Sequence, residues 1–207
     1  MKSVFPDRFF VTGTDTGVGK TMVCALLAAG LRHNYWKPVQ SGSMDGLDSD
    51  VVRELAGLEQ DRIIPESYVF SRPLSPHLAA QKEGARIDPD LIQLPANHGS
   101  LIIEGAGGVL VPLNKDFLMI DLIKKLAVPA LIVASNRLGV INHTLLTVTA
   151  LKQAGIDILG VILNGAVNNE HKQAIEHYGN VSVLAQLERL DNITRKKVKQ
   201  KFNELFL

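Results

Sequence analysis

A glycine-bearing stretch near the start of the chain has the residue types that bind a polyphosphate. Residues 9–21 read as an apolar strand, a turn that carries Gly17 and Gly19, and the start of a helix. The two glycines let successive backbone N–H groups point inward beside a helix N-terminus, which suits phosphate groups. Lys20 is expected to reach the β- and γ-phosphates, and the Thr21 hydroxyl is placed to ligate Mg²⁺.

This stretch departs from the usual P-loop pattern at one position. The pattern asks for Gly, four residues, and then Gly-Lys-Ser/Thr. Thr14 stands where the first glycine belongs, and Gly13 comes one residue early. The alternative is an ordinary glycine-rich turn with a chance lysine. The apolar strand before the turn and the Ala- and Leu-rich helix over 21–32 favour the P-loop.

A second stretch ends a buried strand with a carboxylate. Residues 101–108 read Leu-Ile-Ile-Glu-Gly-Ala-Gly-Gly, with Glu104 as the acid. In P-loop proteins an acid at such a strand end lies next to the Mg²⁺ of the nucleotide. The glycines after it permit close approach of the backbone to a ligand. The alternative is a solvated strand end, but the pairing with the first loop favours a metal ligand.

Two further regions carry charged candidates. Lys37 lies near the end of a strand predicted over 34–38, where it would project toward the phosphate loop or simply reach solvent. Asp48 and Asp50 precede a helix predicted over 51–58. Either acid is a possible helix cap or a possible Mg²⁺ ligand, and the spacing alone does not choose between these roles.

Polar residues near two later strands are also candidates. Residues 138–143 open a helix predicted over 144–153, and its free N–H groups suit a carboxylate. Asn142 is equally suited to be the cap of this helix. Asn164 follows a strand predicted over 158–163 and is placed either to read an adenine edge or to form a turn.

Composition limits the classes of function. The chain has 207 residues, of which 46% are hydrophobic and 21% charged, and a net charge of +1, as expected for one globular domain over 1–207. The even charge argues against nucleic acid or an anionic membrane as a partner. No run of 18 apolar residues predicts a membrane span. The lone Cys24 is expected to be a buried structural residue. The cytoplasm is the default location because no secretory pattern precedes the glycine loop.

Alternating apolar runs and helix-like segments predict an α/β fold. Several runs are continuous, which indicates strands covered on both faces and hence a largely parallel sheet. Ligands of such sheets collect beyond the carboxyl ends of the strands. The strands are predicted at 8–13, 34–38, 67–70, 100–104, 130–134, 158–163 and 181–184. The main helices are predicted at 21–32, 51–58, 77–82 and 144–153, with an amphipathic helix in 191–207.

These motifs together resemble those of the dethiobiotin synthetases, the ATP-dependent carboxylases of biotin biosynthesis. The stretches that carry the resemblance are 11–21, 37–42, 49–50, 75–77, 104–108 and 138–143. The resemblance implies a P-loop fold with a seven-stranded, mostly parallel sheet, helices on both faces and a homodimer. It also implies the reaction of 7,8-diaminononanoate, CO₂ and MgATP to dethiobiotin, ADP and phosphate, through a carbamate and a carbamic–phosphoric anhydride.

The resemblance also implies roles for single residues. Lys20 and Lys37 would be catalytic, and Thr21, Asp50 and Glu104 would bind Mg²⁺. The implied nucleotide-binding set is Thr14, Asp15, Thr16, Gly17, Val18, Gly19, Lys20, Thr21, Met22, Asp50, Glu104, Gly105, Ala106, Gly107, Asn164, Gly165, Ala185, Gln186 and Leu187. The implied substrate-binding set is Thr16, Lys37, Ser41, Gly107, Leu138, Gly139, Val140, Ile141 and Asn142, of which the last five would hold the carboxylate tail across the dimer interface.

The chain departs from the family pattern in two places. Some members have an acid where this chain has Gly17, and many have an Ile-Pro pair where it has Leu184 and Ala185. Two rival classes share a similar loop. Amidotransferase-type synthetases need a glutaminase module with a nucleophilic cysteine, which this chain is too short to contain. Partitioning and positioning ATPases carry a signature lysine where this chain has Asp15.

Overall fold

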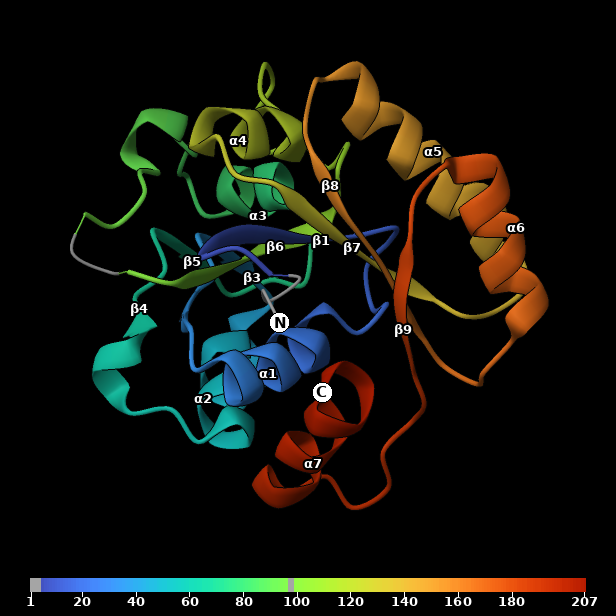
Figure 1. Ribbon diagram of the computed structural model, residues 1–207. Coiled ribbons are helices and arrows are strands. Elements are labelled where there is room, and N and C mark those ends of the chain that lie inside the picture. Colours follow the sequence, from blue (N-terminus) through green and yellow to red (C-terminus); the bar gives the residue numbers. More distant parts are fainter. Residues whose placement is uncertain (1–4, 97–98) are drawn as a thin grey trace.

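A seven-stranded sheet forms the centre of the computed structural model, which describes residues 5–96 and 99–207 (Figure 1). The strand order is β4-β2-β6-β1-β7-β8-β9, and every adjacent pair is parallel. The strands are β1 (Arg8–Gly13), β2 (Asn34–Trp36), β4 (Ile63–Ile64), β6 (Leu101–Gly108), β7 (Ala130–Ser135), β8 (Ile158–Asn164) and β9 (Val183–Leu187). Two short strands, β3 (Val39–Ser41) and β5 (Tyr68–Phe70), pair separately, also in parallel.

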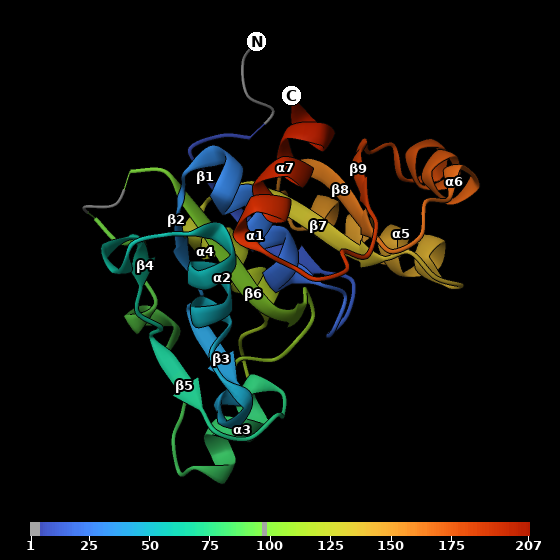
Figure 2. The same ribbon diagram turned by 90° about the horizontal axis from the view of Figure 1, so that it is seen from below.

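Helices cover both faces of the large sheet. Figures 1 and 2 show α1, α2 and α7 on one face and α3, α4 and α5 on the other, with α6 beside α5. The helices are α1 (Lys20–Leu31), α2 (Asp48–Ala56), α3 (Pro76–Lys82), α4 (Met119–Leu126), α5 (Val140–Gln153), α6 (Asn169–Gly179) and α7 (Arg195–Phe206). Short 3₁₀ turns occur at Ser43–Asp45, Gln60–Arg62 and Pro89–Leu91. The predicted fold class is confirmed.

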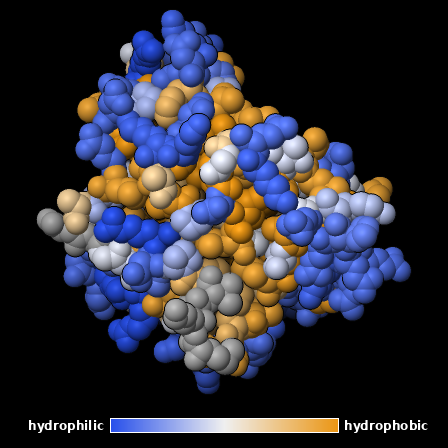
Figure 3. Space-filling model, turned by 45° about the horizontal axis from the view of Figure 1, so that its top comes forward, coloured by the Kyte–Doolittle hydropathy of each residue, from blue (hydrophilic) through white to orange (hydrophobic). Residues whose placement is uncertain are grey.

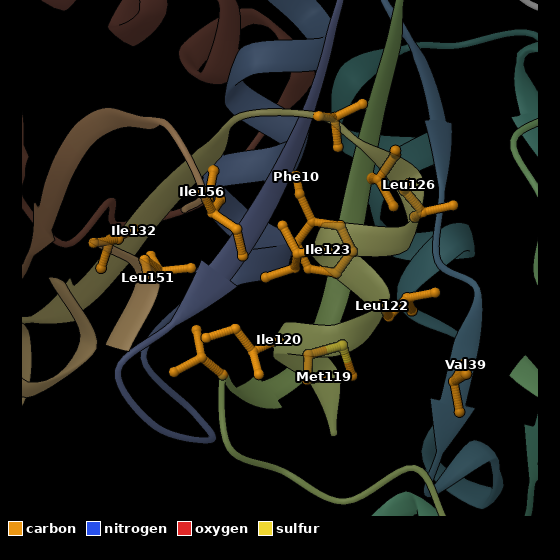
Figure 4. Close-up of a cluster of buried hydrophobic side chains, with 14 of the residues drawn as sticks. Phe10, Val39, Met119, Ile120, Leu122, Ile123, Leu126, Ile132, Leu151 and Ile156 are labelled. Atoms are coloured by element: carbon orange, nitrogen blue, oxygen red, sulfur yellow. The ribbon is translucent and has the colours of Figure 1, made fainter. Parts of the chain in front are cut away.

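The core has two halves, one on each face of the sheet. Successive side chains of a strand point to opposite faces, so Phe9 packs in the cluster beneath α1 and Phe10 in the cluster beneath α4 and α5. Figure 4 shows Ile123 and its neighbours on α4 around the ring of Phe10. Both phenylalanines are fully buried. Burying a side chain of this size contributes about 1.5–3 kcal/mol, which anchors the strand that leads into the glycine loop.

Several strand predictions need correction. The strand at 67–70 forms β5 of the small sheet, while the edge of the large sheet is β4, whose two residues are too few to give a periodic pattern. The strand predicted over 100–104 continues past Glu104 to Gly108. The last strand begins at Val183 and not at 181. The strands at 8–13, 130–134 and 158–163 are confirmed.

Two helix-cap predictions are wrong. Helix α2 begins at Asp48 with Leu47 as its N-cap, so neither Asp48 nor Asp50 caps it. Helix α5 begins at Val140 after Gly139, so Asn142 lies inside its first turn. The sequence did not suggest α4 or α6, although α4 is strongly amphipathic and its Asp121 accepts a hydrogen bond from the Leu118 amide at 2.8 Å.

Within 5–96 and 99–207, none of the helices has the length and apolar character that crossing a membrane requires.

Candidate active site

The glycine loop joins β1 to α1 and is held from the side by β8. Gly17 and Gly19 have positive φ angles of 72° and 96°, which glycine adopts without strain. The Asn164 side chain donates a hydrogen bond to the Val18 carbonyl at 2.9 Å. It lies so close to the loop that a Cβ on Gly19 would be 2.1 Å from Asn164 Nδ2. The loop shape therefore depends on glycine at position 19 and on an amide at 164.

Lys20 lies beneath this loop with its ammonium group largely out of water. Its Nζ donates a hydrogen bond to the Asp15 carbonyl at 3.2 Å. Burial lowers the pKa of Lys20, although the negative charge of Glu104 opposes this effect. A cation that burial disfavours is stabilised by an incoming anion, so this lysine is well placed to bind phosphate.

Glu104 is the centre of a buried polar cluster. Its side chain is 1% exposed. Its Oε1 accepts hydrogen bonds from Thr21 Oγ1 at 2.9 Å and from Lys37 Nζ at 3.2 Å. Its Oε2 accepts one from the Tyr35 hydroxyl at 2.8 Å. The fold thus brings α1, β2, the link after β2 and β6 together around one carboxylate.

Lys37 lies between β2 and β3, where Pro38 interrupts the strand. Its Nζ also pairs with the carboxylate of Asp48. Burial lowers the pKa of Lys37, but the charges of Glu104 and Asp48 outweigh this, so the net effect is a raised pKa. Lys37 is therefore a cation at neutral pH, and the alternative of a solvent-facing lysine is wrong because Lys37 is only 4% exposed.

These groups line a cavity of about 620 Å³. Its size suits a small substrate together with the end of a triphosphate. The hydroxyl of Ser41 is buried and has no hydrogen-bond partner within the described residues, as expected for a group that meets a ligand. Ten of the predicted site residues line the cavity: Thr16, Gly17, Gly19, Lys20, Thr21, Lys37, Ser41, Glu104, Ala106 and Gly107.

The sequence did not mark the apolar wall of the cavity. This wall is contributed mainly by α2 and its approach, by the loop before α3, and by the link after β6. Its apolar members are Leu47, Val51, Pro73, Leu74, Pro76 and Val111. Residues 73–76, which follow β5, line the cavity, and the β3–β5 pairing that places them there gives no sequence signal.

The two acids before α2 lie in different surroundings. Asp48 lines the cavity and pairs with Lys37. The Asp50 side chain is 62% exposed, lies outside the cavity lining and pairs with Arg53 at 3.3 Å. An exposed ion pair of this kind contributes little stabilising free energy. The pair with Arg53 therefore does not prevent the Asp50 side chain from binding another group.

The residues expected near adenine lie beside the loop, at the carboxyl ends of β8 and β9. Gly165 N donates to the Leu187 carbonyl at 2.8 Å. The Gln186 amide oxygen accepts from Asn168 N at 2.8 Å and from Asn136 Nδ2 at 3.4 Å. Ala185 is buried. These residues lie outside the lining of the large cavity, and only Asn164 contacts the loop directly through a hydrogen bond.

The remaining predicted residues are placed as follows. Val18 is buried, Met22 packs against the core in α1, and Gly105 continues β6. Thr14 and Asp15 line a second, smaller groove against α5.

The start of α5 lies away from the large cavity. Leu138 is 97% exposed, and none of 138–142 lines that cavity. The smaller groove beside α5 includes Leu110 and Leu146, which are 61% and 62% exposed. Apolar residues also gather in the middle of the face seen in Figure 3, with hydrophilic residues toward its edges. Exposed apolar surface of this kind is typical of an interaction site.

The donor set of the large cavity fits Mg²⁺. In the described part of the chain, no group of three or more His, Cys, Asp or Glu side chains is arranged to hold a metal. Mg²⁺ in nucleotide sites needs no such cage, because phosphate oxygens and water complete the shell around one or two protein ligands. Thr21 Oγ1 and Glu104 Oε1, 2.9 Å apart, are hard oxygen donors, and both residues line the same cavity as Lys20.

Known structures share this fold at low sequence identity. A ParA family ATPase from Chlorobium tepidum has a TM-score of 0.57 and 16% identity, over 97% of this chain and 91% of that one. The septum site-determining protein MinD from Pyrococcus horikoshii, complexed with Mg-ADP, has a TM-score of 0.56 and 19% identity, over 95% and 88%. At these identities the likeness establishes the P-loop fold and no more.

Relatives in sequence are much closer. A family model described as an AAA domain matches residues 7–197. The ATP-dependent dethiobiotin synthetase of Paramagnetospirillum magneticum is 49% identical over 89% of both chains. That of Lawsonia intracellularis is 44% identical over 97% of this chain and 99% of its own. That of Rhodopseudomonas palustris is 45% identical over 96% and 95%. The chain therefore belongs to the ATP-dependent dethiobiotin synthetases, a family of ligases in biotin biosynthesis.

Proposed function

We propose that the chain converts 7,8-diaminononanoate and CO₂ to dethiobiotin, with Mg²⁺ and ATP required and ADP and phosphate released. The observation that carries this proposal is the cavity in which Lys20 and Lys37 flank Glu104 beneath the glycine loop. The substrates are inferred from the family to which the chain belongs. The lysines that line the cavity are suited to binding the anionic groups of these substrates.

The chemistry brings together two anions. An uncharged amine of the substrate attacks CO₂ and forms a carbamate, which must then meet the more highly charged triphosphate. Like charges a few Å apart repel by about 4 kcal/mol at a protein-like dielectric. Lys20 and Lys37 would supply positive charge where the two anions meet. Both lysines are buried, and a buried charge acts more strongly than one in water.

The rest of the reaction needs no protein nucleophile. A carbamate oxygen takes the γ-phosphoryl group and forms a carbamic–phosphoric anhydride, and the second amine then closes the five-membered ring and expels phosphate. Lys20 would hold the phosphate being transferred, and Lys37 would hold the carbamate oxygen. The apolar wall with Leu47, Leu74 and Val111 would pack against the carbon chain of the substrate.

The bound Mg²⁺ would neutralise the phosphates and polarise the transferred group. Thr21 and Glu104 would hold it from the protein side, and Asp50 remains the third proposed ligand. Ser41, Thr16 and Gly107 would contact the substrate on the opposite wall of the cavity. Asn164, Gly165 and the stretch 185–187 would hold the adenine end.

We also propose that the active form is a homodimer in the cytoplasm. The start of α5, residues 138–142, lies outside the large cavity of its own chain. A second copy packed on the apolar surface near Leu110 and Leu146 would bring this helix start to the carboxylate tail of the substrate.

A mass-spectrometric assay tests the proposed function. The purified chain is incubated with MgATP, 7,8-diaminononanoate and ¹³C-labelled bicarbonate. We expect dethiobiotin one mass unit heavier than the unlabelled product, and none when ATP or the diamine is left out. Absence of dethiobiotin from the complete mixture would refute the proposal.

A further inference from the structure

Tyr35 makes a contact that none of the roles above uses. It lies on β2, with its neighbour Ile102 on β6 in register, and its side chain is 0% exposed. Its hydroxyl donates a hydrogen bond of 2.8 Å to Glu104 Oε2. The ring packs in the apolar cluster that includes Val23 and Cys24 of α1. The packed ring therefore holds the hydroxyl of Tyr35 in a fixed position as a hydrogen-bond donor to Glu104 Oε2.

The two oxygens of Glu104 have different partners. Oε1 lies on the side of Thr21 and Lys37, at 2.9 Å and 3.2 Å, toward the cavity. Oε2 faces Tyr35. The last torsion of a glutamate is broad and weakly restrained by itself. A hydrogen bond to one oxygen therefore helps to fix which way the carboxylate plane faces and which oxygen meets a ligand.

We infer that Tyr35 is a positioning residue for the metal site, and that it holds Glu104 by Oε2 so that Oε1 alone is presented toward Thr21 and the Mg²⁺. This inference rests on the proposed function only for the presence of Mg²⁺ at Thr21 and Glu104. Groups that orient a metal ligand typically change metal affinity by about 10–100-fold when they are removed. The phenol of Tyr35 reaches the site only through Glu104, so its effect must pass through that carboxylate.

The variant Tyr35→Phe keeps the ring and removes only the hydroxyl. With a non-hydrolysable ATP analogue present, we expect Mn²⁺ binding measured by electron paramagnetic resonance to weaken about tenfold. Binding of the analogue without metal should stay within about twofold, because Lys20 and the loop are untouched. Turnover of the variant should recover as Mg²⁺ is raised, since excess metal compensates for a weakened ligand.

Tyr68→Phe is the matched control. The Tyr68 hydroxyl accepts a hydrogen bond from Asp88 N at 3.0 Å, outside the cavity lining, and its removal should leave Mn²⁺ affinity unchanged. Unchanged Mn²⁺ affinity in Tyr35→Phe would overturn the inference, as would a turnover defect that saturating Mg²⁺ does not relieve. Both results leave the proposed function standing. Conversely, a wild-type chain that makes no dethiobiotin refutes the proposed function even where Mn²⁺ binding responds to Tyr35.

Discussion

Lys37, just after β2, and Glu104, on the neighbouring strand β6, face each other with 3.2 Å between Nζ and Oε1. Both side chains are almost fully buried, at 6% and 1% exposure. Burying two charges is costly unless each has further partners. Here Thr21, Tyr35 and Asp48 supply them. Both residues line the large cavity together with Lys20, which is consistent with the proposed role of the pair in the reaction.

Replacement of Lys37 by alanine should reduce turnover far more than nucleotide binding. Loss of a cation that stabilises developing charge typically costs about 10²–10³-fold in kcat. The affinity for MgATP should change little, since Lys20 and the glycine loop remain. Steady-state kinetics and equilibrium binding of an ATP analogue separate the two effects. The exposed Lys196 gives a control variant, Lys196→Ala, that should behave as wild type. Wild-type turnover in Lys37→Ala would remove this residue from the mechanism.

The raised pKa of Lys37 predicts how its charge responds to pH. Its folded-state pKa lies above the ordinary value of 10.5, because the charges of Glu104 and Asp48 outweigh the effect of burial. The stabilisation from this protonated lysine is therefore fully present below pH 10.5 and is lost as pH rises through the folded pKa. We expect the difference in unfolding free energy between wild type and Lys37→Met, from urea titrations, to stay constant from pH 7 to 9. A steady decline of this difference over that range would contradict the assignment.

Gly19→Ala should weaken nucleotide binding strongly. A side chain at a φ of 96° is strained, by about 1–2 kcal/mol, and its Cβ would displace Asn164, which holds the Val18 carbonyl. We expect at least about a tenfold loss of ATP-analogue affinity by isothermal titration, since 1.4 kcal/mol corresponds to a factor of ten. Gly155 has a φ of 71° and nothing within 4 Å of an added Cβ, so Gly155→Ala carries the strain alone and should bind normally. Equal affinities for the two variants would contradict this account of the loop.

The two acids before α2 can be told apart by one pair of variants. Asp50→Asn should weaken Mn²⁺ binding about tenfold if Asp50 is the third ligand. Asp48→Asn should instead lower turnover, because Asp48 pairs with Lys37 and sets its position. Metal binding and kcat are measured on both proteins. Loss of metal affinity in Asp48→Asn alone would transfer the ligand role to Asp48.

Leu146→Glu should separate the proposed dimer. A charge introduced into an apolar contact surface is costly to bury, and Leu146 is 62% exposed in the groove beside α5. We expect a monomer by light scattering, with dethiobiotin formation reduced and ATP-analogue affinity retained. Leu91→Glu changes a leucine of similar exposure, 69%, outside this groove and should leave the dimer intact. A Leu146→Glu protein with wild-type mass and activity would contradict the proposed interface.

Much of the fold could be predicted from sequence because buried parallel strands leave continuous apolar runs. The run 130–134 predicted β7 almost to the residue, since it is covered on both faces. Strand β4 could not be found in this way, because two residues have no period. The strand at 67–70 predicted β5, but its pairing with β3 could not be predicted, because both strands are short and meet only through the tertiary fold.

In the candidate site, too, the residues on or next to clearly marked strands could be predicted, and those that depend on tertiary contacts could not. Lys20 and Thr21 follow one strand that the sequence marks clearly, Glu104 lies on another, and the structure brings the three residues together. Asp48 was one of two acids with equal claims, and only the path of the chain into α2 decides which one meets Lys37. Tyr35 reads in the sequence as one more apolar strand residue, so its hydroxyl contact with Glu104 could not be expected without the neighbouring strand.

The most direct test of the central claim is the ratio of ADP released to dethiobiotin formed. If the cavity joins a carbamate to the γ-phosphate, each product molecule uses one ATP, and ADP release stops when the diamine or bicarbonate is omitted. We therefore predict a ratio of one across substrate concentrations. Sustained ADP release that needs neither substrate, and that rises with DNA or lipid, would contradict the account and point to a partitioning-type ATPase on the same fold.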